Sequence, residues 1–220
     1  LAPVRTGLEI LRRTSTDPTT LDMMERQLMQ LVRLVDDLLD VSRISRGKIT
    51  LSRETVDVGE VIASAREATE AELAVGVRTV TVDRAPDLPL IDADFVRAVQ
   101  IVSNLLSTAR MFTDEGGHVR VTARSDAGFV CLSVADDGIG IEPEKLPHVF
   151  ELFNQGAPVK GTGLGIGLTL VRTLAEMHGG RVAAESGGPG KGSKFSVWLP
   201  IATAKRTPAA ERERPRKPDP

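Results

Sequence analysis

Two glycine-rich turns constrain this chain more than any other feature of its sequence. The first runs from Asp136 to Ile141 (DDGIGI) after an apolar strand pattern, and the second runs from Gly161 to Leu168 (GTGLGIGL) and opens a helix pattern. Glycine lets backbone amides approach a phosphate closely, and a helix N-terminus adds partial positive charge at the same place. A carboxylate at the end of a strand, such as that of Asp136, can instead accept a hydrogen bond from an exocyclic amine, as in adenine.

Neither turn matches the common phosphate-binding motifs. No Gly-Lys-Ser/Thr follows either turn, which excludes a Walker loop. The first turn lacks a third glycine and a parallel crossover unit, which excludes a Rossmann fingerprint. Each turn taken alone is equally well explained as an ordinary glycine turn, because short glycine patterns are weak signals.

Composition narrows the classes of partner and cofactor. The chain has 220 residues, enough for one large domain or two small ones, and a net charge of -2, which does not suggest a nucleic-acid or membrane-surface binder. No apolar run is long enough for a membrane span. The single cysteine, Cys131, lies in an apolar strand pattern, so we expect a buried structural thiol and no intramolecular disulfide. His118, His148 and His178 have no partners at metal-ligand spacing.

The N-terminal region has the pattern of a packed helical hairpin. Along its predicted second helix, apolar residues repeat at alternating spacings of three and four, which is the pattern of a heptad seam. These residues are Leu21, Met24, Leu28, Leu31, Val35 and Leu38. We expect this helix to end near Ser45, with Gly47 as its cap. The apolar stripe is too wide for one hairpin to bury, so we expect two hairpins to form one bundle in a two-fold dimer. A hairpin that packs on its own domain remains the alternative.

The rest of the chain predicts an α+β fold. Alternating patterns predict strands at residues 49–51 and 77–83, and two hairpins formed by 118–124 with 129–135 and by 181–185 with 194–199. Helices are expected from Asp57 to about residue 74, after a cap at Asp92, and over 165–177, with a short helix and turn over 143–153. This order predicts helices on one side of a mostly antiparallel sheet. Residues 201–220 are rich in Pro, Arg and Glu and are expected to form a disordered linker.

The two turns, with Phe150-Glu151-Leu152-Phe153 between them, resemble the ATP-binding domain of sensor histidine kinases. Gyrase-type ATPases share that fold. The hairpin region resembles the dimerisation and phosphotransfer hairpin of the same kinases. The resemblance implies three segments: a partial dimerisation hairpin at 1–46, an ATP-binding α/β sandwich at 47–200 with helices on one face of a mixed sheet, and the linker.

The resemblance also implies a site for ATP and Mg²⁺. The family's asparagine box is matched by Asn104, but its second asparagine is Thr108 here and its lysine is Met111. Magnesium would be held by Asn104 and Thr108. A short lid before the second turn leaves Lys160 as its one cation. The implied ATP-binding residues are Asn104, Thr108, Asp136, Gly138, Gly140, Lys160, Gly163, Leu164, Gly165, Gly167, Leu168 and Ser196.

The activity implied is transfer of the γ-phosphate to a histidine, for relay to a response regulator or receiver domain. None of the three histidines matches the family's acceptor position, which would lie upstream of Leu1. We therefore expect this chain to be a piece of a longer protein, cytoplasmic in this segment, with membrane attachment of the parent left open. Alone it should not autophosphorylate.

Two alternatives remain open at this point. Thr108 and Met111 suit a degenerate kinase that acts as a dimeric scaffold or a nucleotide sensor. A related ATPase or an anti-sigma type serine kinase would also use the glycine turns. The N-terminal hairpin argues against that last class, whose members lack such a dimerisation module.

Overall fold

The computed structural model describes residues 50–73, 77–152 and 165–203, together with Leu28, Val32, Val35 and Leu39. The chain divides into two units, residues 1–49 and 50–220, and the second is described here by itself. Most of the predicted hairpin, the lid with Lys160, Gly163 and Leu164, and the tail from residue 204 lie outside the described residues. The proposed segment boundaries therefore stay predictions.

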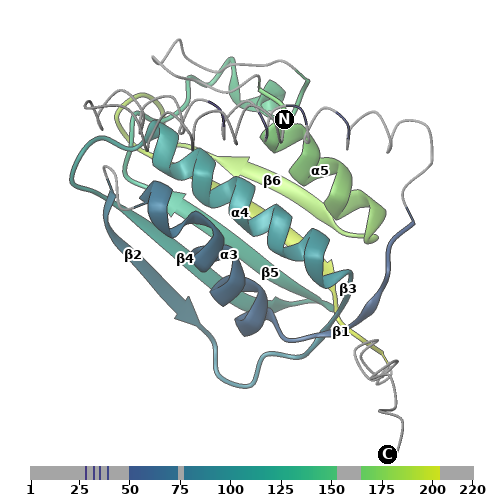
Figure 1. Ribbon diagram of the computed structural model, residues 1–220. Coiled ribbons are helices and arrows are strands. Elements are labelled where there is room, and N and C mark those ends of the chain that lie inside the picture. Colours follow the sequence, from purple (N-terminus) through teal and green to yellow (C-terminus); the bar gives the residue numbers. More distant parts are fainter. Residues whose placement is uncertain are drawn as a thin grey trace, which may run out of the picture. The chain divides into compact units, whose positions relative to one another are not determined.

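The second unit is built on a five-stranded sheet (Figure 1). Its strands lie in the order β2 (Val77–Arg84), β4 (Gly117–Asp126), β5 (Phe129–Asp136), β7 (Ser193–Pro200) and β6 (Arg181–Glu185). The β2–β4 pair is parallel and the other pairs are antiparallel. Both predicted hairpins, β4–β5 and β6–β7, are confirmed.

Helices α3 (Val58–Leu73), α4 (Phe95–Phe112) and α5 (Gly167–Met177) lie side by side on one face of this sheet (Figure 1). The predicted fold class, a mixed and mostly antiparallel sheet covered on one face by helices, is confirmed. Helix α4 contacts both α3 and α5, so it is the central helix of the layer. Among the described helices, none is both long and apolar enough to cross a bilayer.

The core is aliphatic and follows the two periodicities of the elements. Alternate residues of β4 and β5 face the helices and are buried: Val119, Val121, Ala123, Val130, Leu132 and Val134. Helix α4 buries a stripe at helical spacing that consists of Ala98, Ile101, Val102, Leu105, Leu106 and Ala109. Cys131 points to the other face of the sheet from its buried neighbours. It is half-buried, so the expectation of a buried thiol is wrong.

A second, two-stranded sheet corrects two local expectations. It pairs β1 (Glu54–Val56) with β3 (Ile91–Ala93), so the strand expected at 49–51 lies further along the chain. Asp92 lies within β3, opposite Thr55, and cannot cap the following helix. The N-cap of α4 is Asp94, whose Oδ1 accepts a hydrogen bond from the Arg97 amide at 3.1 Å.

Two predicted helices are shorter in the structure. Over residues 143–152, the described part of the predicted segment, the one helical element is the 3₁₀ turn η1 (Leu146–His148), and Pro147 within it has no amide to continue a helix. Helix α5 begins at Gly167 rather than at residue 165. Gly165 has a φ of 70°, a left-handed conformation that an α-helix does not contain.

Candidate functional site

Asp136 ends β5 with its side chain on the helix side of the sheet. Its Oδ1 accepts hydrogen bonds from the amides of Gly138 at 3.0 Å and Ser193 at 3.3 Å, and its Oδ2 accepts one from Ser193 Oγ at 2.5 Å. Burial raises the pKa of this carboxyl above its ordinary value of 3.8, and the bonds from Ser193 and Gly138 oppose that rise. The half-buried carboxylate is therefore an acceptor that neighbouring donors hold in one orientation.

The turn after Asp136 is held between two other backbones. The Ile139 amide donates to the carbonyl of Phe112, at the end of α4, at 3.0 Å. From the β6–β7 connection, the Gly190 amide donates to Ile139 O at 2.7 Å and the Gly192 amide to Gly138 O at 3.1 Å. These bonds fix the turn against α4 on one side and against the β6–β7 connection on the other.

Two glycines of this turn have no room for a side chain. A Cβ on Gly138 would lie 2.0 Å from Phe112 O, and a Cβ on Gly140 would lie 2.1 Å from Gly188 O. Those separations are far inside van der Waals contact. Glycine is required at both positions by the approach of backbone to backbone, whatever ligand the turn also meets.

Asn104 and Thr108 lie one helical turn apart on α4. Thr108 Oγ1 donates to the carbonyl of Asn104 at 2.7 Å, which leaves the hydroxyl oxygen able to accept or to ligate. A Cβ on Gly167 would lie 3.4 Å from Asn104 Oδ1, so the carboxamide lies beside the first residue of α5. An amide oxygen and a hydroxyl oxygen fit Mg²⁺ as two ligands of a shell completed by phosphate oxygens and water. The described residues contain no cluster of three or more His, Cys, Asp or Glu that could hold a metal.

The first turn of α5 has amides available for an anion. Ile166 occupies its N-cap position, and no side chain among the described residues caps it. The first amides of a helix have no partner within the helix and carry partial positive charge. Thr169 Oγ1 donates to Phe150 O at 3.1 Å, and the Phe150 ring meets Phe195 edge to face at 6.2 Å between centroids. These contacts anchor the start of α5 to the sheet.

The structure therefore gathers most of the described candidate residues around α4. Asp136, Gly138 and Gly140 lie at its C-terminal end, and Asn104 faces the start of α5. Gly167 and Leu168 form that start, and Gly165 lies two residues before it. The arrangement can offer an oriented carboxylate at one place, and oxygen ligands with helix amides at another.

Ser196 corrects the sequence-based assignment. Residues of β7 alternate between the two faces of the sheet, and Ser196 pairs with Ser133, with 2.9 Å between their hydroxyl oxygens. Ser193 pairs with Asp136 and shares its face. Ser196 therefore lies on the opposite face of the sheet from Asp136, and the hydroxyl beside that carboxylate belongs to Ser193.

Sequence reasoning missed two serines of the site. Ser193 is one, and Ser186 is the other: its hydroxyl accepts from the Ile141 amide at 3.0 Å and donates to Gly192 O at 2.7 Å. Both flank the glycine-rich connection 187–192. The strand register that opposes Ser193 to Asp136 was the signal that could have found the first of them.

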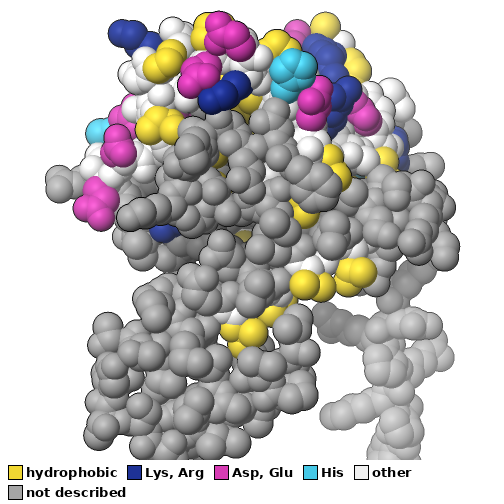
Figure 2. Space-filling view, turned by 90° about the horizontal axis from the view of Figure 1, so that it is seen from above, with side chains coloured by type: hydrophobic (Ala, Val, Ile, Leu, Met, Phe, Trp, Pro, Cys, Tyr) yellow, Lys and Arg dark blue, Asp and Glu magenta, His cyan; other side chains and the backbone are white. Residues whose placement is uncertain are grey.

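The exposed carboxylate of the first glycine turn, Asp137, is paired with a histidine. The Asp137 carboxylate accepts hydrogen bonds from the His118 backbone amide at 2.8 Å and from the His118 ring at 3.0 Å. The hydrogen bond from the backbone amide is the largest of the effects that lower the pKa of Asp137. Figure 2 shows basic and acidic side chains interspersed with hydrophobic ones over the described part of one face. Those residues offer no surface of a single charge sign on this face.

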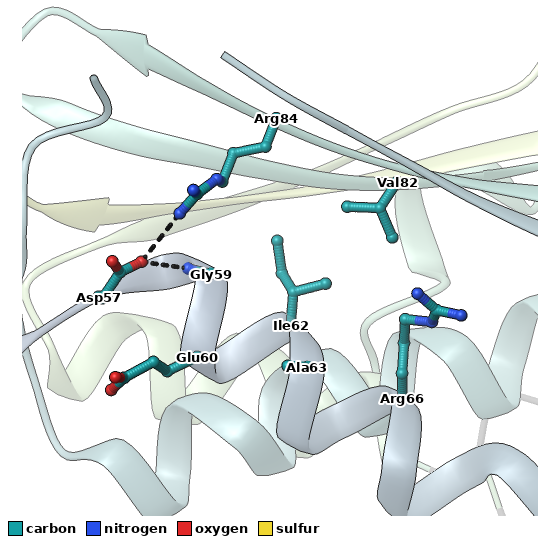
Figure 3. A pocket seen from close by; sticks show the side chains of 8 residues that line it. All are labelled: Asp57, Gly59, Glu60, Ile62, Ala63, Arg66, Val82 and Arg84. Atoms are coloured by element: carbon teal, nitrogen blue, oxygen red, sulfur yellow. Dashed lines mark hydrogen bonds and ion pairs between the residues drawn. The ribbon is translucent and has the colours of Figure 1, made fainter. Parts of the chain in front are cut away.

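A separate pocket lies between α3 and β2 (Figure 3). Its volume is about 430 Å³, and it has charged groups at its rim and apolar side chains, Ile62 and Val82, facing each other. An ion pair at its edge joins Arg84 to Asp57 at 3.1 Å. None of the predicted site residues lines it, so it is distinct from the candidate site. The lining residues are Asp57, Gly59, Glu60, Ile62, Ala63, Arg66, Val82 and Arg84.

The fold and this arrangement of glycine turns define a class of ATPase. The model of the histidine kinase-, DNA gyrase B- and HSP90-like ATPases matches residues 93–203, and the chain belongs to that family. Among curated proteins it is 37% identical over 174 residues to the sensor protein DivL of Caulobacter vibrioides, covering 78% of this chain and 22% of DivL. It is 36% identical over 215 residues to the sensor histidine kinase TrcS of Mycobacterium tuberculosis, covering 91% of this chain and 41% of TrcS.

Solved structures give the same result. Full-length ShkA in complex with AMPPNP superposes with a TM-score of 0.73 at 30% identity, covering 90% of this chain and 42% of that one. The mycobacterial sensor histidine kinase MprB superposes with a TM-score of 0.61 at 27% identity, covering 67% of this chain and 98% of that one. The chain resembles the core of sensor histidine kinases, and it spans less than half the length of the curated relatives named here.

Proposed function

We propose that this chain is the core of a sensor histidine kinase, which binds ATP with Mg²⁺ and passes the γ-phosphate to a histidine. The observation that carries the proposal is the arrangement around α4. An oriented carboxylate, Asp136, lies where the turn joins the C-terminal end of α4, and Asn104 faces the start of α5, which no side chain of the described residues caps. Helix α4 thus connects a carboxylate that can bind the adenine base with groups that can bind phosphates.

We assign recognition of the adenine base to Asp136. A carboxylate offers about four lone-pair sites, and three hydrogen bonds from Ser193 and Gly138 use part of that capacity. The exocyclic amine of adenine is a donor that the remaining capacity can accept. AMPPNP, an analogue of ATP, is the ligand named for the ShkA complex, which supports nucleotide binding by this chain.

The phosphate side rests on Asn104, Thr108 and the start of α5. Magnesium, when bound, would neutralise charge between the phosphates, as in other phosphoryl transfers. This chain's own residues would supply the amide and hydroxyl oxygens that ligate it and the helix amides that bind phosphate oxygens. Lys160, outside the described residues, is proposed to add a positive charge from the lid.

The acceptor is proposed to be a histidine outside this chain. His178 is fully buried with both ring nitrogens in hydrogen bonds, and His118 and His148 each pair with a carboxylate. These partners leave them poorly suited to attack a phosphate. The partners proposed are a response regulator or receiver domain and a second copy of the chain. Val35 and Leu39 of the N-terminal unit are each 45% exposed, which supports dimerisation through that unit.

Calorimetric titration of ATP into the chain, with and without Mg²⁺, tests the nucleotide site. We expect binding that tightens with Mg²⁺, and a weaker magnesium effect in Thr108→Val, which keeps the shape and loses the hydroxyl. Absence of ATP binding by folded protein would refute the proposal. Binding indifferent to Mg²⁺ would leave a nucleotide binder that does not transfer phosphate.

The proposed phosphotransfer is tested with a longer chain. A chain extended to include the family's acceptor position should become labelled from ATP that carries a labelled γ-phosphate, and its acceptor His→Gln variant should not. Folded, ATP-binding protein that stays unlabelled would contradict kinase activity and leave nucleotide binding intact.

A further inference from the structure

His178 joins the end of one helix to the start of another. It is fully buried at the C-cap of α5. Its Nδ1 lies 2.7 Å from the carbonyl of Leu174, and its Nε2 lies 3.0 Å from the amide of Asp94 at the start of α4. A carbonyl can only accept and an amide N–H can only donate. The ring therefore carries its proton on Nδ1 and a lone pair on Nε2, which is the neutral form.

The charged groups around this ring act on the same two helix ends. Asp94 caps α4 through the Arg97 amide, and its other oxygen accepts from the Ser52 amide at 2.9 Å. The Arg53 guanidinium donates to the carbonyl of Met177 at 2.6 Å and to Asp92 at 3.3 Å. Arg53, Asp92 and Asp94 are the charges that act on His178. Burial, the largest effect, lowers the pKa of His178 below 6.5.

These two helices carry the phosphate side of the candidate site at their other parts. Asn104 lies ten residues along α4 from Asp94, and Gly167 lies eleven residues along α5 from His178. At a rise of 1.5 Å per residue, the contact between His178 and Asp94 lies about 15 Å along each helix from Asn104 and Gly167. Because α4 and α5 also contact each other directly, we expect a shift at the His178 contact to change how Asn104 faces Gly167.

We propose that neutral His178 is a positioning residue for nucleotide binding, which holds α4 and α5 in the arrangement that places Asn104 beside the start of α5. The inference rests on the proposed function. A proton on Nε2 would set two donors, that nitrogen and the Asp94 amide, against each other and would bury a charge. Acidification should therefore release the contact and weaken nucleotide binding from a distance.

Reciprocity gives a test that needs no mutation. If neutral His178 favours nucleotide binding, bound nucleotide must favour neutral His178 by the same factor. The chain has three histidines, so their ring signals can be followed individually by NMR across a pH titration. Saturating AMPPNP with Mg²⁺ should lower the pKa of His178 further. An unchanged titration of His178 in the presence of bound nucleotide would overturn the inference.

Matched variants give a second test. We expect the AMPPNP affinity of the unaltered chain to fall as the pH is lowered from about 7.5 to about 5, where histidine titrates. His178→Gln should bind about tenfold more weakly at pH 7.5, the scale of one lost hydrogen bond, and lose most of the pH dependence. His148→Gln, at an exposed histidine paired with Glu151, should keep both.

The outcomes separate the two proposals. An unaltered chain that binds no AMPPNP at pH 7.5 refutes the proposed function, and this inference with it. Nucleotide binding that keeps its full strength and pH dependence in folded His178→Gln refutes only the positioning role and leaves the proposed function standing. Should His178→Gln not fold, the NMR titration of the unaltered chain decides.

Discussion

The function of a carboxylate at residue scale depends on the donors that surround it. Asp136 and Asp137 are adjacent, yet burial raises the pKa of the first and the hydrogen bond from the His118 amide lowers that of the second. The raised pKa means that the folded, nucleotide-free chain binds a proton at Asp136 more readily than the unfolded chain does. Ionised Asp136 therefore costs stability above pH 3.8, and a donor on a ligand would relieve that cost.

Asp136→Asn tests this account. We expect ATP affinity to fall about 10- to 100-fold, since a hydrogen bond to a charged group contributes about 1.5–3 kcal/mol. Folding stability should be unchanged or higher, because the buried charge is removed. Asp137→Asn, at the exposed neighbour, is the control and should retain ATP affinity. Calorimetry and urea unfolding measure the two effects, and equal loss of affinity in both variants would contradict the role given to Asp136.

His178 makes stability depend on pH in the opposite direction. Its pKa is lowered in the folded state, so between pH 6.5 and that lower value the unfolded chain binds more protons than the folded one. The stabilisation is complete above pH 6.5 and is lost as the pH falls. Urea unfolding at several pH values should give a midpoint that decreases below pH 6.5. The decrease should be shallower in His178→Gln, and an equal slope in both proteins would remove His178 as its source.

At the scale of elements, the glycine turns act first as contacts between backbones. Gly138→Ala would put a methyl group 2.0 Å from Phe112 O, and backbone cannot move aside as a flexible side chain can. We expect a loss of about 1–3 kcal/mol in the free energy of unfolding. Gly187→Ala is the matched control, because its Cβ would meet only the Lys191 side chain, at 3.1 Å. Chemical denaturation of both variants measures the difference, and comparable losses would contradict the packing argument.

Elements were predictable where the pattern within each segment was sufficient. Both hairpins were predictable from alternating apolar residues around turns. The buried apolar face of α4 was predictable from apolar residues at helical spacing. The cap of α4 was not predictable in this way. Asp92 and Asp94 are equally good caps by residue type. The pairing of β3 with β1, a contact distant in sequence, decides between them.

The motifs of the site were predictable from the sequence, but which residues lie beside them in space was less so. The turns at residues 136–141 and 161–168 are visible in the sequence, as is Asn104. The position of Ser193 beside Asp136 depends on the register of β7 against β5, and a one-residue shift would exchange Ser193 for a residue of the other face. The role of His178 was not predictable from the sequence around it. The structure buries its ring as a neutral link, and the partner amide of Asp94 lies 84 residues away in sequence.

At the scale of the whole molecule, α4 makes the site depend on the entire helical layer. It is fixed at its start by Asp94 and His178, along its length by buried contacts with α3 and α5, and at its end by Ile139. The groups of the candidate site are thereby placed relative to one helix. In the proposed kinase core, a displacement of α4 would reach both the adenine side and the phosphate side of the site.

The N-terminal unit gives the prediction that concerns assembly. Leu28 is buried, whereas Val35 and Leu39 are each 45% exposed, and apolar side chains at heptad spacing favour a partner helix. We expect the chain to be a dimer in sedimentation equilibrium and Val35→Asp/Leu39→Asp to be a monomer. Val96→Asp is the matched control: Val96 is 69% exposed on α4 of the other unit, so a charge there should leave the dimer intact.

Both variants should bind ATP like the unaltered chain, because the site lies within residues 104–193. A double variant that stays dimeric would place the dimer contact on another surface, and one that becomes monomeric and loses ATP binding would show that the nucleotide site depends on the dimer.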